Sequence, residues 1–301
     1  MVPLFFTQKF LDYLASEKRF SEHTILAYKK DVEQFLEFSY IKSEVDIKEV
    51  NSKLIRGWMV SLIDNGIEST SVNRKLSTLR TMFKWLMREG VIDNNPIKSV
   101  KGPKNNKRLP SFAQQSDVHL ENIKSLFNDD FEGVRDLLMF EMLYQTGVRS
   151  SELINLLDVR VSNNQIRVLG KRNKERIIPI STELSSLINL YREKRKEIDP
   201  FPECFFLLKS AKKLYPKFVY RKINNYLGEV TGLEKKSPHI LRHTFATHML
   251  NNGASLEVLK EILGHTSLAA TQIYTHNSFS QLTNIYSQSH PRGQKKTNRW
   301  I

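Results

Sequence analysis

The segment STSVNRKLSTLRTMFKWLMREG, residues 69–90, carries the clearest helical pattern in this 301-residue chain. Its apolar residues recur at intervals of four and three, and a glycine follows them: Val72, Leu76, Leu79, Phe83, Leu86 and then Gly90. This spacing places the apolar side chains on one face of a helix, and glycine is a common helix terminator. We therefore expect a helix here that packs on a core, in a fold that is mainly α.

The sequence on either side of this segment extends the helical pattern over the first hundred residues. In SEHTILAYKKDVEQFLEF, residues 21–38, Tyr28, Val32 and Phe35 follow Ser21 at helical spacing. A serine before such a run is typical of a helix N-cap. We therefore expect residues 1–102 to form a helical-bundle domain.

A basic, irregular stretch follows this domain. KSVKGPKNNKRLP, residues 98–110, has prolines and asparagines, no apolar periodicity and five lysines or arginines. Such a composition is typical of a linker. We place a basic linker at 103–116 and a second domain at 117–301.

The second domain is predicted to be mostly helical with a small antiparallel sheet. EGVRDLLMFEMLYQTG, residues 132–147, has the pattern of a helix that ends at its glycine. NQIRVLG (164–170) and ERIIPIS (175–181) then alternate or run apolar like strands, on either side of a polar tip at 171–174. Helical patterns continue from there to the C-terminus.

Composition restricts the class of protein. The chain has 46 Lys+Arg against 32 Asp+Glu, a net charge of +14, which favours an anionic polymer such as nucleic acid as partner. No apolar run reaches the length of a membrane span, and the N-terminus resembles a helix start more than a signal peptide. The single cysteine, Cys204, excludes an internal disulfide. We expect a cytoplasmic protein that does not contact a membrane.

Several basic residues are candidates for DNA contacts. Arg74, Lys75 and Arg80 lie off the apolar face of the 69–90 helix, and Lys107 and Arg108 lie in the linker. A solvated basic face would give the same pattern, and the net charge of the chain favours DNA.

SPHILRHTFATHML, residues 237–250, places two polar side chains on one helix face. Ser237 can cap this helix, and His239 and Arg242 follow three residues apart. A guanidinium and an imidazole together suit a phosphate, although an ion-paired arginine beside a packed histidine is the structural alternative. His239 and His243 also have the spacing of a zinc-protease helix, but Ile240 stands where that motif has glutamate, which disfavours zinc.

Three further residues are weaker candidates for a functional site. In YQTGVRSSELINL (144–156), Arg149 follows a Thr-Gly turn at a helix start, where it could share a phosphate with the helix amides or form an ordinary surface pair with Glu152. Lys171 lies at the predicted hairpin tip, where most lysines are merely solvated. In LGHTSLAATQIYTH (263–276), Tyr274 alone would be read as a packing residue.

The order of these residues resembles the signature of the tyrosine recombinases (phage integrase-like), and within them the bacterial XerC/XerD branch. The matching residues are Arg149, Lys171, His239, Arg242, His265 and Tyr274, in TGVRSSEL, GKRNKERIIPI, HILRHTFATH and LGHTSLAATQIYTH. The resemblance covers nearly the whole chain. One departure is Arg172, where the family usually has glycine, and it leaves Lys174 as an alternative to Lys171.

The resemblance implies a fold, partners and a biological role. The N-terminal domain would be a SAM-like core-binding domain, and the C-terminal domain would be catalytic. The partner would be double-stranded DNA, bound by a homo- or hetero-tetramer with a second, related recombinase, and a septal DNA translocase could be a further partner. The role would be chromosome dimer resolution in cell division, or integration of a mobile element. Neither a metal nor another cofactor is implied.

The resemblance also implies a role for each catalytic residue. Tyr274 would attack the scissile phosphate and form a 3′-phosphotyrosyl bond, while Arg149 and Arg242 stabilise the charge that develops on the oxygens. Lys171 would protonate the departing 5′ oxygen.

The two histidines would assist this reaction. His239 would help proton transfer, and His265 would hydrogen-bond the phosphate.

Two other functions remain open. A type IB topoisomerase would share the nucleophile and arginines, and a DNA-binding regulator would use the site without catalysis.

Overall fold

The computed structural model describes residues 5–105, 111–170, 174–199, 202–264 and 276–293. The chain divides into two compact units, Met1–Arg108 and Leu109–Ile301. The division falls within the stretch 103–116, while the finer domain boundaries at 102 and 117 remain predictions.

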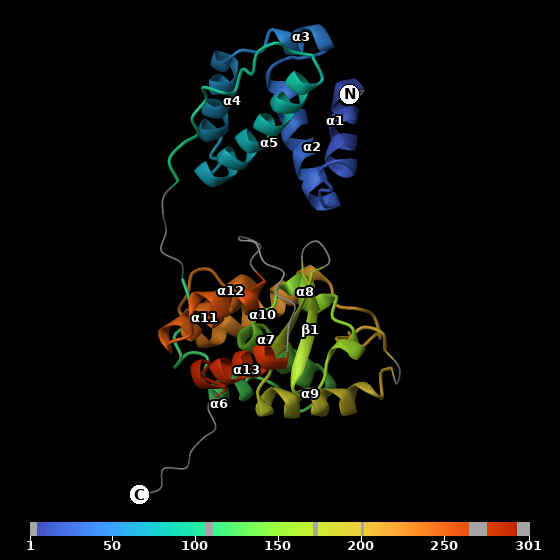
Figure 1. Ribbon diagram of the computed structural model, residues 1–301, viewed down its shortest axis with the longest axis vertical. Coiled ribbons are helices and arrows are strands. Elements are labelled where there is room, and N and C mark those ends of the chain that lie inside the picture. Colours follow the sequence, from blue (N-terminus) through green and yellow to red (C-terminus); the bar gives the residue numbers. More distant parts are fainter. Residues whose placement is uncertain (1–4, 106–110, 171–173, 200–201, 265–275, 294–301) are drawn as a thin grey trace, which may run out of the picture. The chain divides into compact units, whose positions relative to one another are not determined.

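The N-terminal unit is a helical bundle, drawn from blue to cyan in Figure 1. Its described helices are α1 (Phe5–Ser16), α2 (Glu22–Phe38), α3 (Glu44–Lys48), α4 (Ser52–Asp64) and α5 (Ser69–Arg88). The predicted apolar face of α5 is confirmed, since Val72, Leu76, Leu79, Phe83 and Leu86 are all fully buried. They pack in one core with Phe35 of α2 and Trp58 of α4.

Short polar side chains cap the starts of α2, α3 and α4. The predicted cap at Ser21 is confirmed, because its hydroxyl accepts a hydrogen bond from the Thr24 amide. Asn51 caps α4 in the same way, accepting from the amides of Lys53 and Leu54. These bonds satisfy amides that the first helical turn leaves without a partner.

The C-terminal unit is also mainly helical and contains one small sheet. Its described elements are α6 (Leu120–Lys124), α7 (Phe131–Thr146), α8 (Ser150–Ile154), the 3-10 helix η1 (Asp158–Arg160), β1 (Gln165–Leu169), β2 (Glu175–Pro179), α9 (Thr182–Arg195), α10 (Pro216–Val230), α11 (Pro238–Asn251), α12 (Leu256–Leu263) and α13 (His276–Ser289). β1 and β2 are antiparallel, with Gln165 opposite Pro179 and Leu169 opposite Glu175. The predicted fold class is confirmed.

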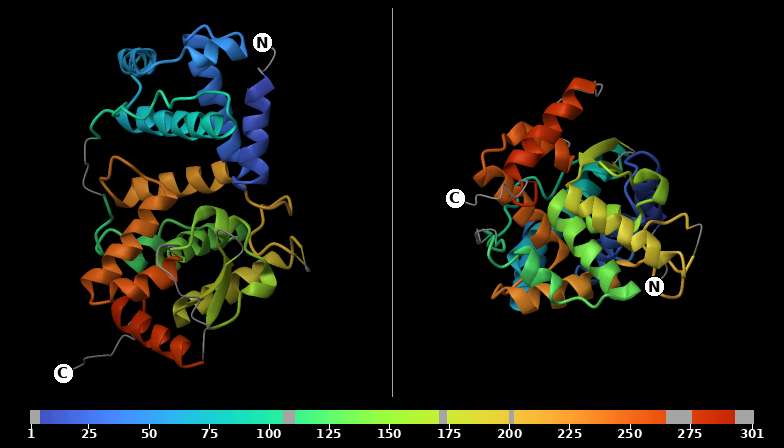
Figure 2. Two further views of the ribbon diagram at one scale, coloured as in Figure 1. Left: turned by 45° about the horizontal axis from the view of Figure 1, so that its top comes forward. Right: turned by 90° about the horizontal axis from the view of Figure 1, so that it is seen from below.

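Helix α7 forms the centre of this unit. Every residue from Val134 to Thr146 is buried, as expected for a helix surrounded by other elements. It packs against α9 and against α11. In the left view of Figure 2, the orange helices lie on one side of the unit and the yellow-green hairpin lies on the other.

The last described helix, α13, packs on its own unit. Leu282 and Tyr286 are buried, and α13 contacts α11 and β2. Beyond it, Arg292 forms an ion pair of 2.8 Å with the buried Glu141 of α7. No helix among the described residues is long and apolar enough to cross a membrane.

Candidate active site

A buried carboxylate lies at the start of α8. Glu152 accepts hydrogen bonds of 2.8 Å from both the amide and the guanidinium of Arg149, the residue that precedes α8. The predicted Arg149–Glu152 pair therefore exists, but it is not the ordinary surface pair that the sequence left open. Glu152 is only 8% exposed because α8 carries it into the unit.

A second arginine binds the same carboxylate from the hairpin. Arg176 of β2 donates to both oxygens of Glu152, at 2.9 and 2.8 Å. Burial alone would raise the pKa of the Glu152 carboxyl, but the hydrogen bonds and charge of Arg176, with the donors of Arg149, hold it at about 2. Glu152 is thus ionised at neutral pH and joins α8 to β2.

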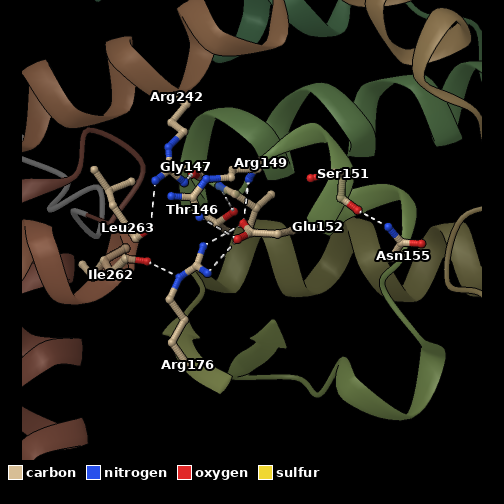
Figure 3. A network of polar contacts seen from close by, with 11 residues as sticks. Thr146, Gly147, Arg149, Ser151, Glu152, Asn155, Arg176, Arg242, Ile262 and Leu263 are labelled. Atoms are coloured by element: carbon tan, nitrogen blue, oxygen red, sulfur yellow. Dashed lines mark hydrogen bonds and ion pairs between the residues drawn. The ribbon is translucent and has the colours of Figure 1, made fainter. Parts of the chain in front are cut away.

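Arg242 reaches the same region from α11. Its guanidinium donates to the backbone oxygens of Gly147 and, at 2.8 Å, Leu263. These carbonyls end α7 and α12, and both helices end in a glycine with left-handed backbone, Gly147 and Gly264. Arg242 therefore lies where α7, α8 and α12 meet (Figure 3).

The cluster in Figure 3 combines three guanidinium groups with one carboxylate, so these four side chains carry a net charge of +2. Burial, followed by the positive charge of Arg149, lowers the pKa of Arg242 to about 10. The direction of this shift shows that the cationic form is disfavoured here by its surroundings. A bound phosphate would relieve that cost, because its oxygens accept from guanidinium groups and supply negative charge.

The structure also describes the predicted residue His239 and the base of the β1–β2 hairpin. His239 is the second residue of α11, one turn before Arg242, and it is exposed. Gly170 donates a 2.8 Å hydrogen bond to the Lys174 carbonyl across the base of the hairpin tip. Lys174 is exposed as well.

Several predicted residues lie outside the described ranges. These are Lys171, His265, Tyr274, Lys107 and Arg108. Their positions in the sequence still connect them to described residues, because Gly170 and Gly264 directly precede Lys171 and His265. Their roles remain predictions.

The predicted DNA-contact residues of α5 make intramolecular contacts. Arg74 and Lys75 both form ion pairs with Asp31 of α2, which is 1% exposed. The Lys75 side chain is itself only 14% exposed, whereas that of Arg74 is 49% exposed. Arg80 donates to the Val100 carbonyl at 3.1 Å. Arg74 and Arg80 are thus exposed and held by contacts within the unit, whereas Lys75 is mostly covered.

Sequence reasoning missed Arg176. It lies in the stretch GKRNKERIIPI that carries part of the family resemblance, where only Lys171 and Lys174 were named as candidates. The strand pattern held a usable indication, because Arg176 falls two residues before Ile178 and thus on the same face as that buried residue. An arginine on the buried face of a strand requires an acidic partner.

The described residues contain no group of three or more histidine, cysteine, aspartate or glutamate side chains that could hold a metal ion. His239 and His243 lie one turn apart on α11, as their spacing requires. The positive groups that the structure does place here are the guanidinium groups of Arg149, Arg176 and Arg242.

Comparison with known families and relatives gives a consistent result. Residues 117–281 match the sequence profile described as "Phage integrase family", and residues 7–90 match "Phage integrase, N-terminal SAM-like domain". Tyrosine recombinase XerC of Thermodesulfovibrio yellowstonii is 36% identical over 297 residues, covering 95% of this chain and 96% of that protein. XerC of Staphylococcus aureus (strain N315) is 35% identical over 294 residues, covering 96% and 97%.

Solved structures share the fold at lower identity. XerH site-specific recombinase bound to palindromic difH substrate, in a post-cleavage complex, has a TM-score of 0.71 and 22% identity, with 93% of this chain and 84% of that chain covered. A lambda integrase dimer bound to a COC′ core site has a TM-score of 0.66 and 18% identity, with 98% and 78% covered.

Proposed function

The chain belongs to the phage integrase family of tyrosine recombinases, and on this premise we propose how its residues cut and rejoin DNA. It is a tyrosine-type site-specific DNA recombinase. Double-stranded DNA is its substrate, in keeping with the net charge of +14.

The observation that carries the residue assignment is the meeting of two distant arginines. Arg242 bonds the carbonyl of Gly147, 95 residues away in sequence and two residues before Arg149. The charge of Arg149 is also near enough to lower the pKa of Arg242. We assign these two guanidinium groups to the non-bridging oxygens of the scissile phosphate, where they stabilise the charge that builds up in the transition state.

The reaction is a transesterification. The hydroxyl oxygen of Tyr274 attacks phosphorus, the bond from phosphorus to the 5′ oxygen breaks, and the 3′ side of the strand stays attached to the enzyme as a phosphotyrosyl ester. The 5′ oxygen takes a proton from Lys171, with Lys174 as the alternative acid. The 5′ hydroxyl of a second duplex reverses these steps and joins the exchanged strands.

The histidines complete the assignment. His239, exposed one turn before Arg242, assists the proton transfer from Tyr274, and His265 donates a hydrogen bond to the phosphate. The reaction conserves the energy of the phosphodiester in the phosphotyrosyl ester, so this scheme assigns no step to ATP or a metal ion.

The biological role is chromosome dimer resolution, carried out by a tetramer on two duplexes with itself or a second, related recombinase. Support comes from the relatives named XerC, which match over nearly their full length. A septal DNA translocase is a further partner. Integration of a mobile element is the alternative role for the same chemistry.

A nicked suicide substrate tests the proposal, because loss of a short fragment traps the covalent intermediate. The site is obtained by sequencing the DNA recovered with covalently trapped protein from cells. We expect a covalent protein–DNA band with the wild type and none with Tyr274→Phe. Absence of the band with both proteins would instead favour a DNA-binding regulator, and relaxation of supercoiled DNA without the site would favour a topoisomerase.

A further inference from the structure

We infer that Arg176 is a positioning residue for the proposed reaction, holding Arg149 through Glu152 and the end of α12 through Ile262. The inference rests on the proposed function. Arg176 is 5% exposed, so it acts through its neighbours and does not itself contact DNA.

The guanidinium of Arg176 makes directed bonds from three nitrogens. Nη1 and Nη2 donate to the two oxygens of Glu152, and Nε donates to the Ile262 carbonyl at 2.6 Å. The planar, fork-shaped donor set of arginine allows this arrangement, and the single ammonium of lysine cannot reproduce it. Arg176 therefore connects β2 to both α8 and α12.

Glu152 transmits this constraint to Arg149. One carboxylate oxygen accepts from the Arg149 amide and the other from its guanidinium, each at 2.8 Å. The Arg149 side chain is 26% exposed and has many rotamers, so a carboxylate that cannot turn restricts where its guanidinium points. With Arg176 removed, Glu152 loses the two bonds that fix its plane.

Arg176 also lies against the backbone next to two other proposed catalytic residues. A Cβ built on Gly264, which precedes His265, would lie 3.1 Å from Arg176 Cδ. A Cβ on Gly170, which precedes Lys171, would lie 3.6 Å from Arg176 Nη1. One buried side chain thus contacts the segments that lead to Arg149, Lys171 and His265.

The test separates the rate of cleavage from DNA affinity. Full-length wild type, Arg176→Met and Arg176→Lys are compared by single-turnover formation of the covalent product on the suicide substrate, and by fluorescence anisotropy with an uncleavable duplex of the same site. We expect Arg176→Met to cleave about 100-fold more slowly, since a misplacement of about 1 Å costs that much, with Kd within about threefold. Arg176→Lys should be intermediate, because it keeps the charge and one bond to Glu152.

Arg195 provides a matched control for the loss of a buried arginine. It is also 5% exposed, forms a 2.9 Å ion pair with Asp158 and donates to the Phe205 carbonyl. Arg195→Met should lower the Tm but leave the cleavage rate within about threefold of wild type at a temperature where all variants are folded. Equal slowing in Arg195→Met and Arg176→Met would show that stability alone is involved and overturn the inference.

A double variant identifies the path of the effect. If Arg176 acts through Glu152, Arg176→Met combined with Glu152→Gln should cleave no more slowly than the slower single variant. Multiplication of the two single effects would contradict this path. Should Arg176→Met not fold, the lysine variant decides: cleavage slower than that of the wild type, with wild-type Kd, supports the inference, and the wild-type rate overturns it.

The outcome is distinct from failure of the proposed function. A wild type that forms no covalent product would overturn the function itself. A wild type that cleaves, together with Arg176 variants that cleave equally fast, would overturn only the inference about Arg176.

Discussion

Each unit of this protein contains a buried carboxylate that holds two cations. In the N-terminal unit, Asp31 binds Arg74 and Lys75. In the C-terminal unit, Glu152 binds Arg149 and Arg176. The two clusters are alike in chemistry and differ in what surrounds them.

The two clusters differ in the helices and strands that they join. The Asp31 cluster joins two neighbouring helices, α2 and α5, and the buried hydroxyl of Thr78 donates the remaining bond to the carboxylate. The Glu152 cluster joins a helix start to a strand, and a third guanidinium, that of Arg242, arrives from α11. A local motif of the same kind therefore stabilises helix packing in one unit and concentrates positive charge in the other.

The largest expected effect on the cleavage rate distinguishes the Glu152 cluster of the C-terminal unit from the Asp31 cluster of the N-terminal unit. Arg242→Ala should lower the cleavage rate by about 1,000-fold, because removing one donor to a developing oxyanion costs about 10²–10³. DNA affinity should stay within about fivefold, since many other phosphate contacts remain. Cleavage of the suicide substrate at saturating protein measures the rate.

Arg74→Ala is the counterpart in the other cluster. At saturating protein, the cleavage rate of this variant should be within about threefold of the wild-type rate. Its binding to DNA should instead be weaker, in a salt-dependent way. A cleavage defect in Arg74→Ala as large as in Arg242→Ala would remove the distinction between the two clusters.

The next effect concerns stability of the N-terminal unit. Asp31→Asn leaves two cations facing a buried neutral amide, and breaking a buried ion pair costs about 3 kcal/mol. Two of the three tryptophans of the chain, Trp58 and Trp85, lie in the core of this unit. Urea unfolding followed by tryptophan fluorescence should therefore show the loss, and an unchanged midpoint would mean that the Asp31 cluster contributes nothing to helix packing.

A smaller effect is expected where α7 ends next to the site. Gly147 has a φ of +60°, and a Cβ there would lie 2.6 Å from Phe245 Cδ1 and 2.8 Å from Leu263 Cδ2. Gly147→Ala should destabilise the C-terminal unit by about 2 kcal/mol through left-handed backbone and overpacking. Gly253→Ala is the control, because Gly253 has a φ of +89° and, among the described residues other than its chain neighbours, no atom within 4 Å of its Cβ position. Gly253→Ala should therefore lower the stability less, measured by a thermal melt.

The smallest expected effect is a pH dependence confined to the C-terminal unit. Burial, aided by the charge of Arg292, lowers the pKa of His290 to about 3 from its ordinary 6.5. As the pH falls below 6.5, the unfolded chain takes up this proton and the folded chain does not, so stability is lost with acidification. Between pH 7 and 5.5 the loss should be about 1 kcal/mol.

His290→Gln should flatten this dependence, measured by urea unfolding with circular dichroism. Tryptophan fluorescence should change less over the same range, because His23, the histidine of the N-terminal unit, is exposed. Equal slopes in wild type and His290→Gln would show that His290 does not titrate on unfolding.

Much of the fold was predictable from local sequence. The apolar periodicity of α5, the cap at Ser21, the glycine that ends α7 and the two strands of the hairpin are all confirmed. Each depends on residues within one or two turns, where side-chain direction follows directly from backbone geometry. The helical fold class follows from them.

The site was predictable only in part. The order of arginines, lysine, histidines and tyrosine indicated the family, but the sequence left open whether Glu152 is an ordinary surface partner of Arg149, and it did not indicate Arg176. It also offered Lys75 as a DNA-contact residue, and the structure shows its ammonium bonded to Asp31 and Gln34. Burial decides all three cases, and burial depends on which distant elements pack together.

The sequence by itself determined the family, the helices and the chemical types available to the site. Tertiary structure decided that Arg242 reaches the ends of α7 and α12, and that one carboxylate serves both Arg149 and Arg176. The physical reason is the distance along the chain over which each kind of interaction acts. Helical periodicity and caps act between near neighbours, whereas charges converge only after chain segments far apart have buried their apolar faces in a common core.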